Sequence, residues 1–320
     1  MNASYAVRLV VQCMSSFFVV HLFFSLGVFG LAPFTVRWAE RMRPSVGIAL
    51  LMSLRVLPSV AGFYAACAIV LPSYLRLETD MGPEQVSVWA CLIAVITVAL
   101  FGRPLICGLA AILRSFRFLR HIKCIAQPVR IANREIWIVP EPRVGVAVAG
   151  LIRSRVLLSK ALANTLSHDE LNMVLLHERA HQVSGDNLKR FLLLLLPEPL
   201  PFFNFTRTLD EAWKRLAEWA ADDHAADGNS ERSIALAQAL VRFARFRTPQ
   251  PRCALVTSLV EDHSELVARV QRLLTQQPKA SHDRGLLSVV IAGSFYAVLV
   301  SLSRCTSLPE VHRLLESLFH

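Results

Sequence analysis

Four long apolar stretches stand out in the pattern of hydrophobic and polar positions along the chain. They cover residues 9–29, 54–75, 86–113 and 285–304, and the second starts near Val46 if Arg55 is tolerated within it. About 20 mainly apolar residues cross a bilayer as a helix, so each stretch predicts a transmembrane helix. The first is longer than the core of a signal peptide and is followed by no A-x-A cleavage site, so we expect it to remain as an anchor.

The segment between the third and fourth stretches, residues 114–284, has a different pattern. β-Branched runs separated by Pro and Gly predict short strands at 135–139, 144–149 and 155–158. Further along, Ser167 and Glu170 carry the signature of a capped helix, which we expect to end at Gly185. Helices are also expected at 208–227, 231–246 and 257–274. We therefore predict an α+β domain between the membrane spans.

Some residues do not fit this simple division. Arg55 and Arg103 are costly in lipid, and we expect them to extend to the interface or to mark the true membrane boundary. His21 is expected to pack between helices. The apolar run 191–196, followed by Pro-Glu-Pro-Leu-Pro, is too short to span a membrane. It is either the end of a core helix or a segment resting on the membrane surface.

The composition also indicates a membrane protein. Of the residues, 54% are hydrophobic and only 18% are charged, whereas a soluble chain is about one quarter charged. The net charge of +10 would suit a nucleic-acid-binding protein, but in membrane proteins Lys and Arg gather in cytoplasmic loops. We adopt the second explanation and expect no direct binding of nucleic acid.

The charges of the loops predict the orientation. The loop after the first stretch and the segment after the third are basic, whereas the loop after the second is acidic. The basic residues are Arg37, Arg41, Arg43, Arg114, Arg117, Arg120 and Lys123, and the acidic ones are Glu78, Asp80 and Glu84. Since basic loops stay in the cytoplasm, we expect an outer N-terminus, a cytoplasmic domain of residues 114–284 and a short outer tail of residues 305–320.

The candidate chemistry lies in the capped helix, which contains His177-Glu178-Arg179-Ala180-His181. Histidines four residues apart lie on one helix face, so both imidazoles can bind one metal ion. Glu178 is then placed to take a proton from an attacking water. The seven cysteines include no C-x-x-C pair, so zinc would be bound by histidines and carboxylates. The alternative is a histidine pair on an exposed face, but the apolar residues of this helix predict that it packs into a core.

A catalytic zinc site usually has three protein ligands and one open position. The candidate for the third ligand is Glu218, in the predicted helix 208–227. Asp222, one turn later, would accept the free N–H of a ligand histidine and fix its tautomer. The alternative is a solvated acidic helix face that also includes Asp223 and Asp227.

Asp186 and His224 are further candidates, each with two open interpretations. Asp186 either orients a ligand histidine or satisfies backbone N–H groups just past the helix end. His224 either donates a hydrogen bond to a developing oxyanion or is a surface residue beside Asp223.

The chain resembles the BlaR/MecR-type membrane metallopeptidases in its motifs and in its order of spans, three before the domain and one after it. The motifs are His177-Glu178-Arg179-Ala180-His181 in the capped helix, Asp186-Asn187 and Glu218-Trp219-Ala220-Ala221-Asp222. The resemblance covers nearly all of the chain. It implies a mainly α membrane protein with four transmembrane helices and a zincin-like cytoplasmic domain. In that domain His177, His181 and Glu218 would bind Zn²⁺ and Glu178 would be the catalytic base. The β-lactam-sensing members carry a penicillin-binding domain after the fourth span, and because the chain stops at His320 we expect a member without this sensor.

The resemblance further implies a multi-pass zinc metalloendopeptidase of the bacterial plasma membrane that transduces a signal by cleaving a cytoplasmic helix-turn-helix repressor. An extended substrate would pair with an edge strand from residues 144–158. The signal would arrive through the spans, the outer loop 71–85, the tail 304–320 or a separate sensor partner, and the chain could form a homo-oligomer. One alternative is a quality-control protease for misfolded membrane proteins. Another is a catalytically silent receptor or scaffold, against which the intact Glu178 argues.

Overall fold

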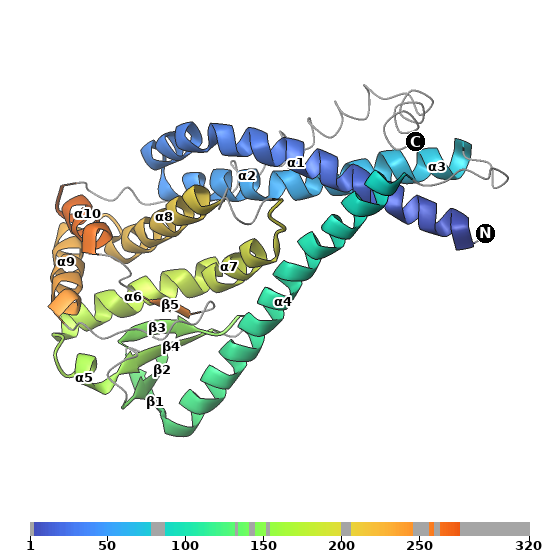
Figure 1. Cartoon of the computed structure of the whole chain (residues 1–320). Coiled ribbons are helices and arrows are strands. Elements are labelled where there is room, and N and C mark those ends of the chain that lie inside the picture. The colour runs from blue at the N-terminus through green and yellow to red at the C-terminus, as the bar shows by residue number, and fades with distance from the viewer. Residues whose placement is uncertain are drawn as a thin grey trace.

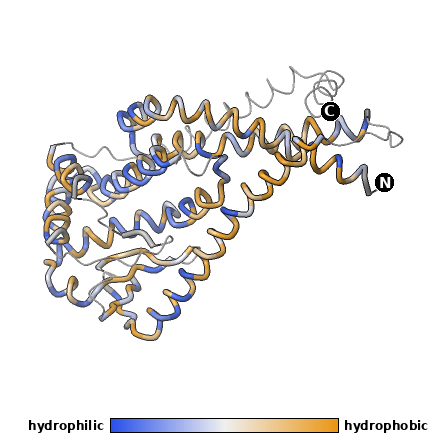
Figure 2. The backbone as a smooth tube through the Cα atoms, in the orientation of Figure 1, coloured by the Kyte–Doolittle hydropathy of each residue, from blue (hydrophilic) through white to orange (hydrophobic). Residues whose placement is uncertain are grey.

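The computed structural model describes residues 3–77, 87–131, 134–140, 145–151, 154–199, 206–245, 256–258 and 263–275. Three helical segments within these residues are long and apolar enough to cross a membrane: Tyr5–Arg41, Pro44–Arg76 and Val88–Ile125. Figure 2 shows long hydrophobic stretches along these segments. The predicted fourth span, 285–304, and the acidic residues Glu78, Asp80 and Glu84 lie outside the described residues.

The first two segments form a helical hairpin. α1 (Ala3–Arg41) is followed by α2 (Pro44–Tyr64), a π-helical stretch η1 (Ala65–Val70) and α3 (Leu71–Leu77). The third segment is the single helix α4 (Val88–Ile125), which diverges from the hairpin and reaches the sheet, as Figure 1 shows. α4 continues beyond the predicted end at residue 113, because its last turns are amphipathic. Ile122 is fully buried, whereas Arg117 and Arg120 are exposed.

Arg55 is tolerated within α2, so the helix begins at Pro44, close to the earlier of the two starts considered for this span. The side chain of Arg55 is buried, and its Nε lies 3.3 Å from Oδ1 of Asp210 while its Nη2 lies 3.5 Å from Oε1 of Glu198. Arg103, which is exposed, lies 3.6 Å from Oε2 of Glu198. Arg55 therefore does not extend to the membrane interface as expected, because two carboxylates of other helices and loops neutralise it inside the protein.

His21 packs between α1 and α2, as predicted. Its ring stacks on Phe17 with centroids 5.3 Å apart, and its Nε2 lies 3.5 Å from Oγ of Ser59 on α2.

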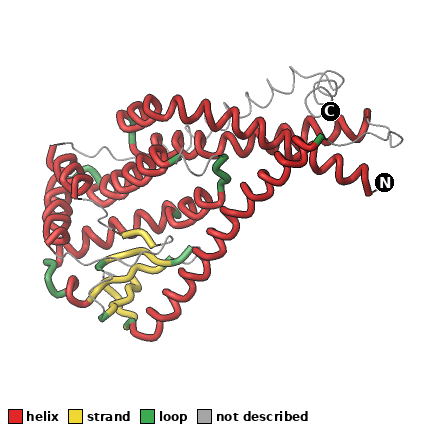
Figure 3. The backbone as a smooth tube through the Cα atoms, viewed as in Figure 1, coloured by secondary structure: helices red, strands yellow, loops and turns green. Residues whose placement is uncertain are grey.

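A five-stranded sheet lies beside the lower end of α4 (Figure 3). Its order is β1-β2-β4-β3-β5, and only the β2–β4 pair is parallel. The strands are β1 (Gln127–Ile131), β2 (Arg134–Val139), β3 (Val146–Ala149), β4 (Arg155–Ser159) and β5 (Val256–Ser258). The three predicted strands are confirmed, and they are joined by β1 and β5, which were not predicted.

β5 corrects two of the predictions. It occupies the start of the predicted helix 257–274, because the β-branched Val256 and Thr257 pair with β3 and satisfy its free backbone groups. The helix there, α10 (His263–Thr275), begins only at His263. In addition, β3 and β4 each have a strand on both sides. The segment 144–158 is therefore not the edge on which we expected a substrate to pair.

The sheet is covered on both faces, and the strand residues alternate between them. Val146 and Val148 pack against α6 (His168–Ser184) and α9 (Ser230–Arg245), whereas Ala147 and Ala149 pack with Ile122 of α4. The short helix α5 (Lys160–Ala163) follows β4 and adds Leu162 to the first of these clusters.

α7 (Asp186–Leu195) and α8 (Arg207–Ala226) connect the sheet and α6 with the spans. A second core joins α1, α2, α7 and α8 around Trp213 and Leu216, which are buried, and it includes Leu193. Leu195 approaches Gly108 of α4 so closely that an added Cβ at Gly108 would lie 2.5 Å from its Cδ2. The apolar run 191–196 is therefore the end of a core helix, the first of the two interpretations offered by the sequence.

Candidate metal centre

The predicted cap and end of the motif helix are confirmed in α6. Oγ of Ser167 accepts the backbone N–H of Glu170, and the Glu170 carboxylate accepts the N–H of Ser167 at 2.8 Å. Gly185 ends the helix with φ of 67°, a left-handed conformation that favours glycine. Because α7 begins at the next residue, Asp186 folds back beside the last turn of α6.

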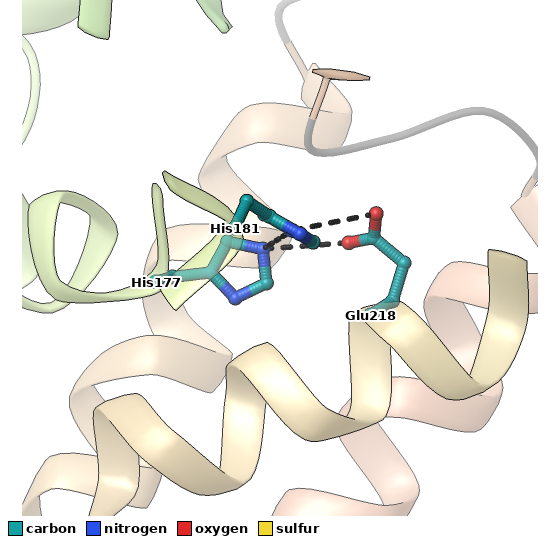
Figure 4. A group of neighbouring side chains, drawn as sticks. All are labelled: His177, His181 and Glu218. Carbon is teal, nitrogen blue, oxygen red and sulfur yellow. Dashed lines mark hydrogen bonds and ion pairs between the residues drawn. The ribbon is translucent and has the colours of Figure 1, made fainter. Parts of the chain in front are cut away.

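His177 and His181 of α6 point toward Glu218 of α8 (Figure 4). One ligand atom from each of the three residues lies within 4.8 Å of the others. Nε2 of His177 lies 3.3 Å from Oε2 of Glu218, and Nε2 of His181 lies 3.6 Å from Oε1. The two Nε2 atoms are 3.1 Å apart. Two lone pairs and a carboxylate thus converge on one position, an arrangement suited to a cation between them.

The other nitrogen of each imidazole faces a second carboxylate. Nδ1 of His177 lies 3.0 Å from Oδ1 of Asp222, and Nδ1 of His181 lies 2.7 Å from Oδ2 of Asp186. A proton on each Nδ1 leaves the Nε2 lone pair free, which is the tautomer that binds a metal. Asp186 also forms an ion pair with Lys189, in which Nζ of Lys189 lies 3.1 Å from Oδ1 of Asp186.

Glu178 is buried next to these residues. No hydrogen-bond partner of either of its carboxylate oxygens lies among the described residues. Burial raises the pKa of Glu178, and the charge of Glu218 adds to this effect. A buried carboxylate without partners is costly, so these oxygens suit a water molecule or substrate at this position.

Arg269 of α10 is a member of the site that sequence reasoning missed. Only 4% of it is exposed. Its Nε and Nη2 donate to the two carboxylate oxygens of Asp222 at 2.8 and 2.7 Å, and its Nη1 lies 2.9 Å from Oε2 of Glu218. A signal was present in the sequence, since Arg269 falls at helical spacing between Leu266 and Leu273, both of which are buried.

The charged neighbours determine the pKa values in the site. Burial alone would raise the pKa of Asp222, but Arg269 and His177 lower it to about 2. For His181 the signs are reversed, because burial alone would lower its pKa. Glu218 and Asp186 instead raise the pKa of His181 to about 10. Asp186, Asp222 and Glu218, whose pKa values are lowered, therefore stay ionised and hold cations beside them.

The remaining candidates lie outside this cluster. His224 is exposed on α8. Asp223 pairs with Arg272 at 2.7 Å, and Asp227 is exposed at the end of α8. Of the four acidic residues Glu218, Asp222, Asp223 and Asp227, only Glu218 and Asp222 thus lie against the histidines of α6.

A comparison with family models agrees with this geometry. The model described as BlaR1 peptidase M56 matches residues 81–273, more than half of the chain. The chain belongs to the M56 peptidase family. The match covers α6, α8 and Arg269 of α10. The chain matches none of the curated proteins.

M56 enzymes are metallopeptidases, and the charges of the site fit a divalent ion. Four carboxylates and two positive side chains lie in or beside the cluster. They are Glu178, Glu218, Asp186, Asp222, Arg269 and Lys189. Metal binding requires neutral histidines; with these and an ionised Glu178 the groups carry two net negative charges, which one divalent cation cancels. Two imidazoles and one carboxylate are ligands that Zn²⁺ accepts in catalytic sites, so the residues present fit this metal.

Proposed function

We propose that this M56 peptidase is a zinc-dependent membrane endopeptidase in which His177, His181 and Glu218 bind the metal and Glu178 is the general base. The observation that carries the proposal is the convergence of two Nε2 atoms and a carboxylate within 4.8 Å, beside a buried carboxylate without a partner among the described residues.

When bound, zinc would polarise the scissile carbonyl and make a water molecule more acidic. Glu178 takes a proton from the attacking water and returns it to the nitrogen of the leaving amine. The raised pKa of Glu178, caused mainly by its burial, suits a group that both accepts and donates a proton. Asp222 and Asp186 keep the two imidazoles in the tautomer that the metal requires.

The proposed substrate is a cytoplasmic transcriptional repressor of the helix-turn-helix type. The resemblance to the BlaR/MecR-type peptidases supports this choice. A cytoplasmic peptidase part is supported by Arg114, Arg117, Arg120 and Lys123, all exposed on the end of α4. A protease of this kind would cut one protein at one position, whereas a quality-control protease would degrade many misfolded membrane proteins.

The variant Glu178→Gln tests the proposal. Its amide cannot accept a proton, but the ligands remain, so we expect cleavage to fall by about 10²- to 10⁴-fold while the zinc content stays unchanged. New N-termini in cells expressing the wild type or the variant are identified by proteomics. A DNA-binding protein among the fragments specific to the wild type supports the signalling role.

The matched control is Glu211→Gln, which changes an exposed carboxylate of α8 that pairs with Arg207 at 2.7 Å. It should leave cleavage unchanged. If Glu178→Gln produces the same fragments as the wild type, the mechanism is wrong. If active enzyme yields fragments of many membrane proteins and no repressor, the quality-control role replaces the signalling role.

A further inference from the structure

Arg269 contacts the proposed metal site from outside the two helices that provide the ligands. α6 supplies His177 and His181, and α8 supplies Glu218. Arg269 comes from α10, is 4% exposed and makes three contacts of 2.9 Å or less with carboxylates of α8. A buried arginine is tolerated only when such partners neutralise it.

The guanidinium holds two carboxylates at once. Its Nε and Nη2 bind both oxygens of Asp222, while its Nη1 lies 2.9 Å from Oε2 of Glu218. The same Oε2 atom lies 3.3 Å from Nε2 of His177. The planar, fixed arrangement of N–H groups in arginine permits this, whereas lysine offers a single point of charge.

Each of the two carboxylates has a separate task at the metal. Glu218 is the proposed third ligand, and Asp222 faces Nδ1 of His177 at 3.0 Å. The two negative charges lie one helical turn apart and next to Glu178, so they repel one another unless a cation lies between them. Arg269 provides this cation, since its guanidinium contacts both carboxylates.

We propose that Arg269 is a positioning residue of this peptidase, which fixes Glu218 and Asp222 so that the Glu218 carboxylate and the His177 imidazole meet the zinc ion in the correct geometry. This inference rests on the proposed function. Arg269 touches neither the substrate nor the metal in this account. It acts through the two carboxylates.

A purely structural role for Arg269 would be to attach α10 to the domain. α10 has other attachments, since Leu266 and Leu273 belong to the same core cluster as Leu236 and Leu240 of α9. Arg272 lies three residues after Arg269 on α10. It pairs with Asp223 at 2.7 Å and lies over the ring of Trp219. Arg272 thus attaches α10 to α8 without contacting a ligand, and it provides a matched control.

The test compares the full chain in detergent with Arg269→Gln, Arg269→Lys and Arg272→Gln. Zinc affinity is measured by competition with a chelator, and the visible absorption spectrum of the Co²⁺-loaded protein reports the coordination geometry. Folding is checked by thermal unfolding of the metal-free proteins. We expect Arg269→Gln to weaken zinc binding by about 10- to 100-fold and to change the cobalt spectrum. Arg272→Gln should change neither measurement.

Arg269→Lys keeps the buried charge but cannot bind both carboxylates. We expect it to fold, to weaken zinc binding by a smaller factor and still to change the cobalt spectrum. It therefore decides the question if Arg269→Gln does not fold. Wild-type zinc affinity and an unchanged cobalt spectrum in a folded Arg269 variant would overturn the positioning role while leaving the proposed function intact. A wild type that binds no zinc would instead overturn the proposed function, and this inference with it.

Discussion

The residue His181 illustrates how a local turn prepares a metal ligand. Gly185 adopts a left-handed conformation, which ends α6 and lets Asp186 begin α7 at once. As a result, Oδ2 of Asp186 lies 2.7 Å from Nδ1 of His181. Asn187 then donates hydrogen bonds to the carbonyl oxygens of Val148 and Gly150 at 3.1 and 2.9 Å, and these fix the turn on the sheet.

This geometry predicts the effect of Asp186→Asn. The amide carries no charge to hold the proton on Nδ1 of His181, so the Nε2 lone pair is less available to the metal. We expect zinc affinity, measured by chelator competition, to fall by about 10-fold or more. The control Asp169→Asn changes an exposed carboxylate in the first turn of the same helix and should bind zinc like the wild type. Equal affinities of the two variants would contradict the role of Asp186.

The sequence was sufficient to find the residues whose spacing is local. His177, Glu178 and His181 follow from helical geometry, and Ser167 and Gly185 from the rules for helix ends. Arg269 could not be assigned in this way, because its role depends on the docking of α10 against α8, 47 residues from Asp222. The sequence shows an arginine at helical spacing between two leucines, but it does not show which residues this arginine contacts.

At the level of elements, α8 serves the spans and the metal centre at the same time. One side of it packs with α1 and α2 through Trp213 and Leu216, and another presents Glu218 to the histidines of α6. Arg215 of α8 also pairs with Glu40 of α1 at 2.5 Å. The position of Glu218 is therefore tied to the membrane hairpin through a single rigid helix.

Gly47 at the start of α2 tests this packing. A Cβ added there would lie 2.7 Å from the carbonyl oxygen of Ala39 and 2.7 Å from Cδ1 of Leu216. We expect Gly47→Ala to lower the free energy of unfolding by about 1–3 kcal/mol, seen as a lower Tm in detergent. The control is Gly30→Ala, where an added Cβ meets nothing within 4 Å and alanine favours the helix. A Gly47→Ala protein as stable as Gly30→Ala would contradict the tight packing of α2 against Leu216 of α8.

The elements that the sequence predicted share strong local periodicity or β-branched runs, as in the helix 208–227 and the strands of 135–158. β5 has neither length nor a near partner. Its three residues pair with β3, more than 100 positions earlier in the chain. The long continuation of α4 was also missed, because its pattern changes from uniformly apolar to amphipathic where the sheet begins to cover Ile122.

On the scale of the whole molecule, the peptidase part lies between the α1–α2 hairpin and the diverging α4 (Figure 1). Glu198, in the connection between α7 and α8, contacts Arg55 of α2 and Arg103 of α4 and accepts a hydrogen bond from Thr206. The connection between two helices of the metal centre is thus bound to two different spans.

The central claim is that His177, His181 and Glu218 bind one zinc ion in this membrane protein. Elemental analysis of the intact chain, purified in detergent, tests it most directly when the wild type is compared with Glu218→Ala and the control Glu211→Ala. We predict about one zinc per chain in the wild type and the control, and a clear loss of zinc in Glu218→Ala, because two histidines alone bind the metal weakly. A wild type without zinc, or a Glu218→Ala protein with the full zinc content, would contradict it.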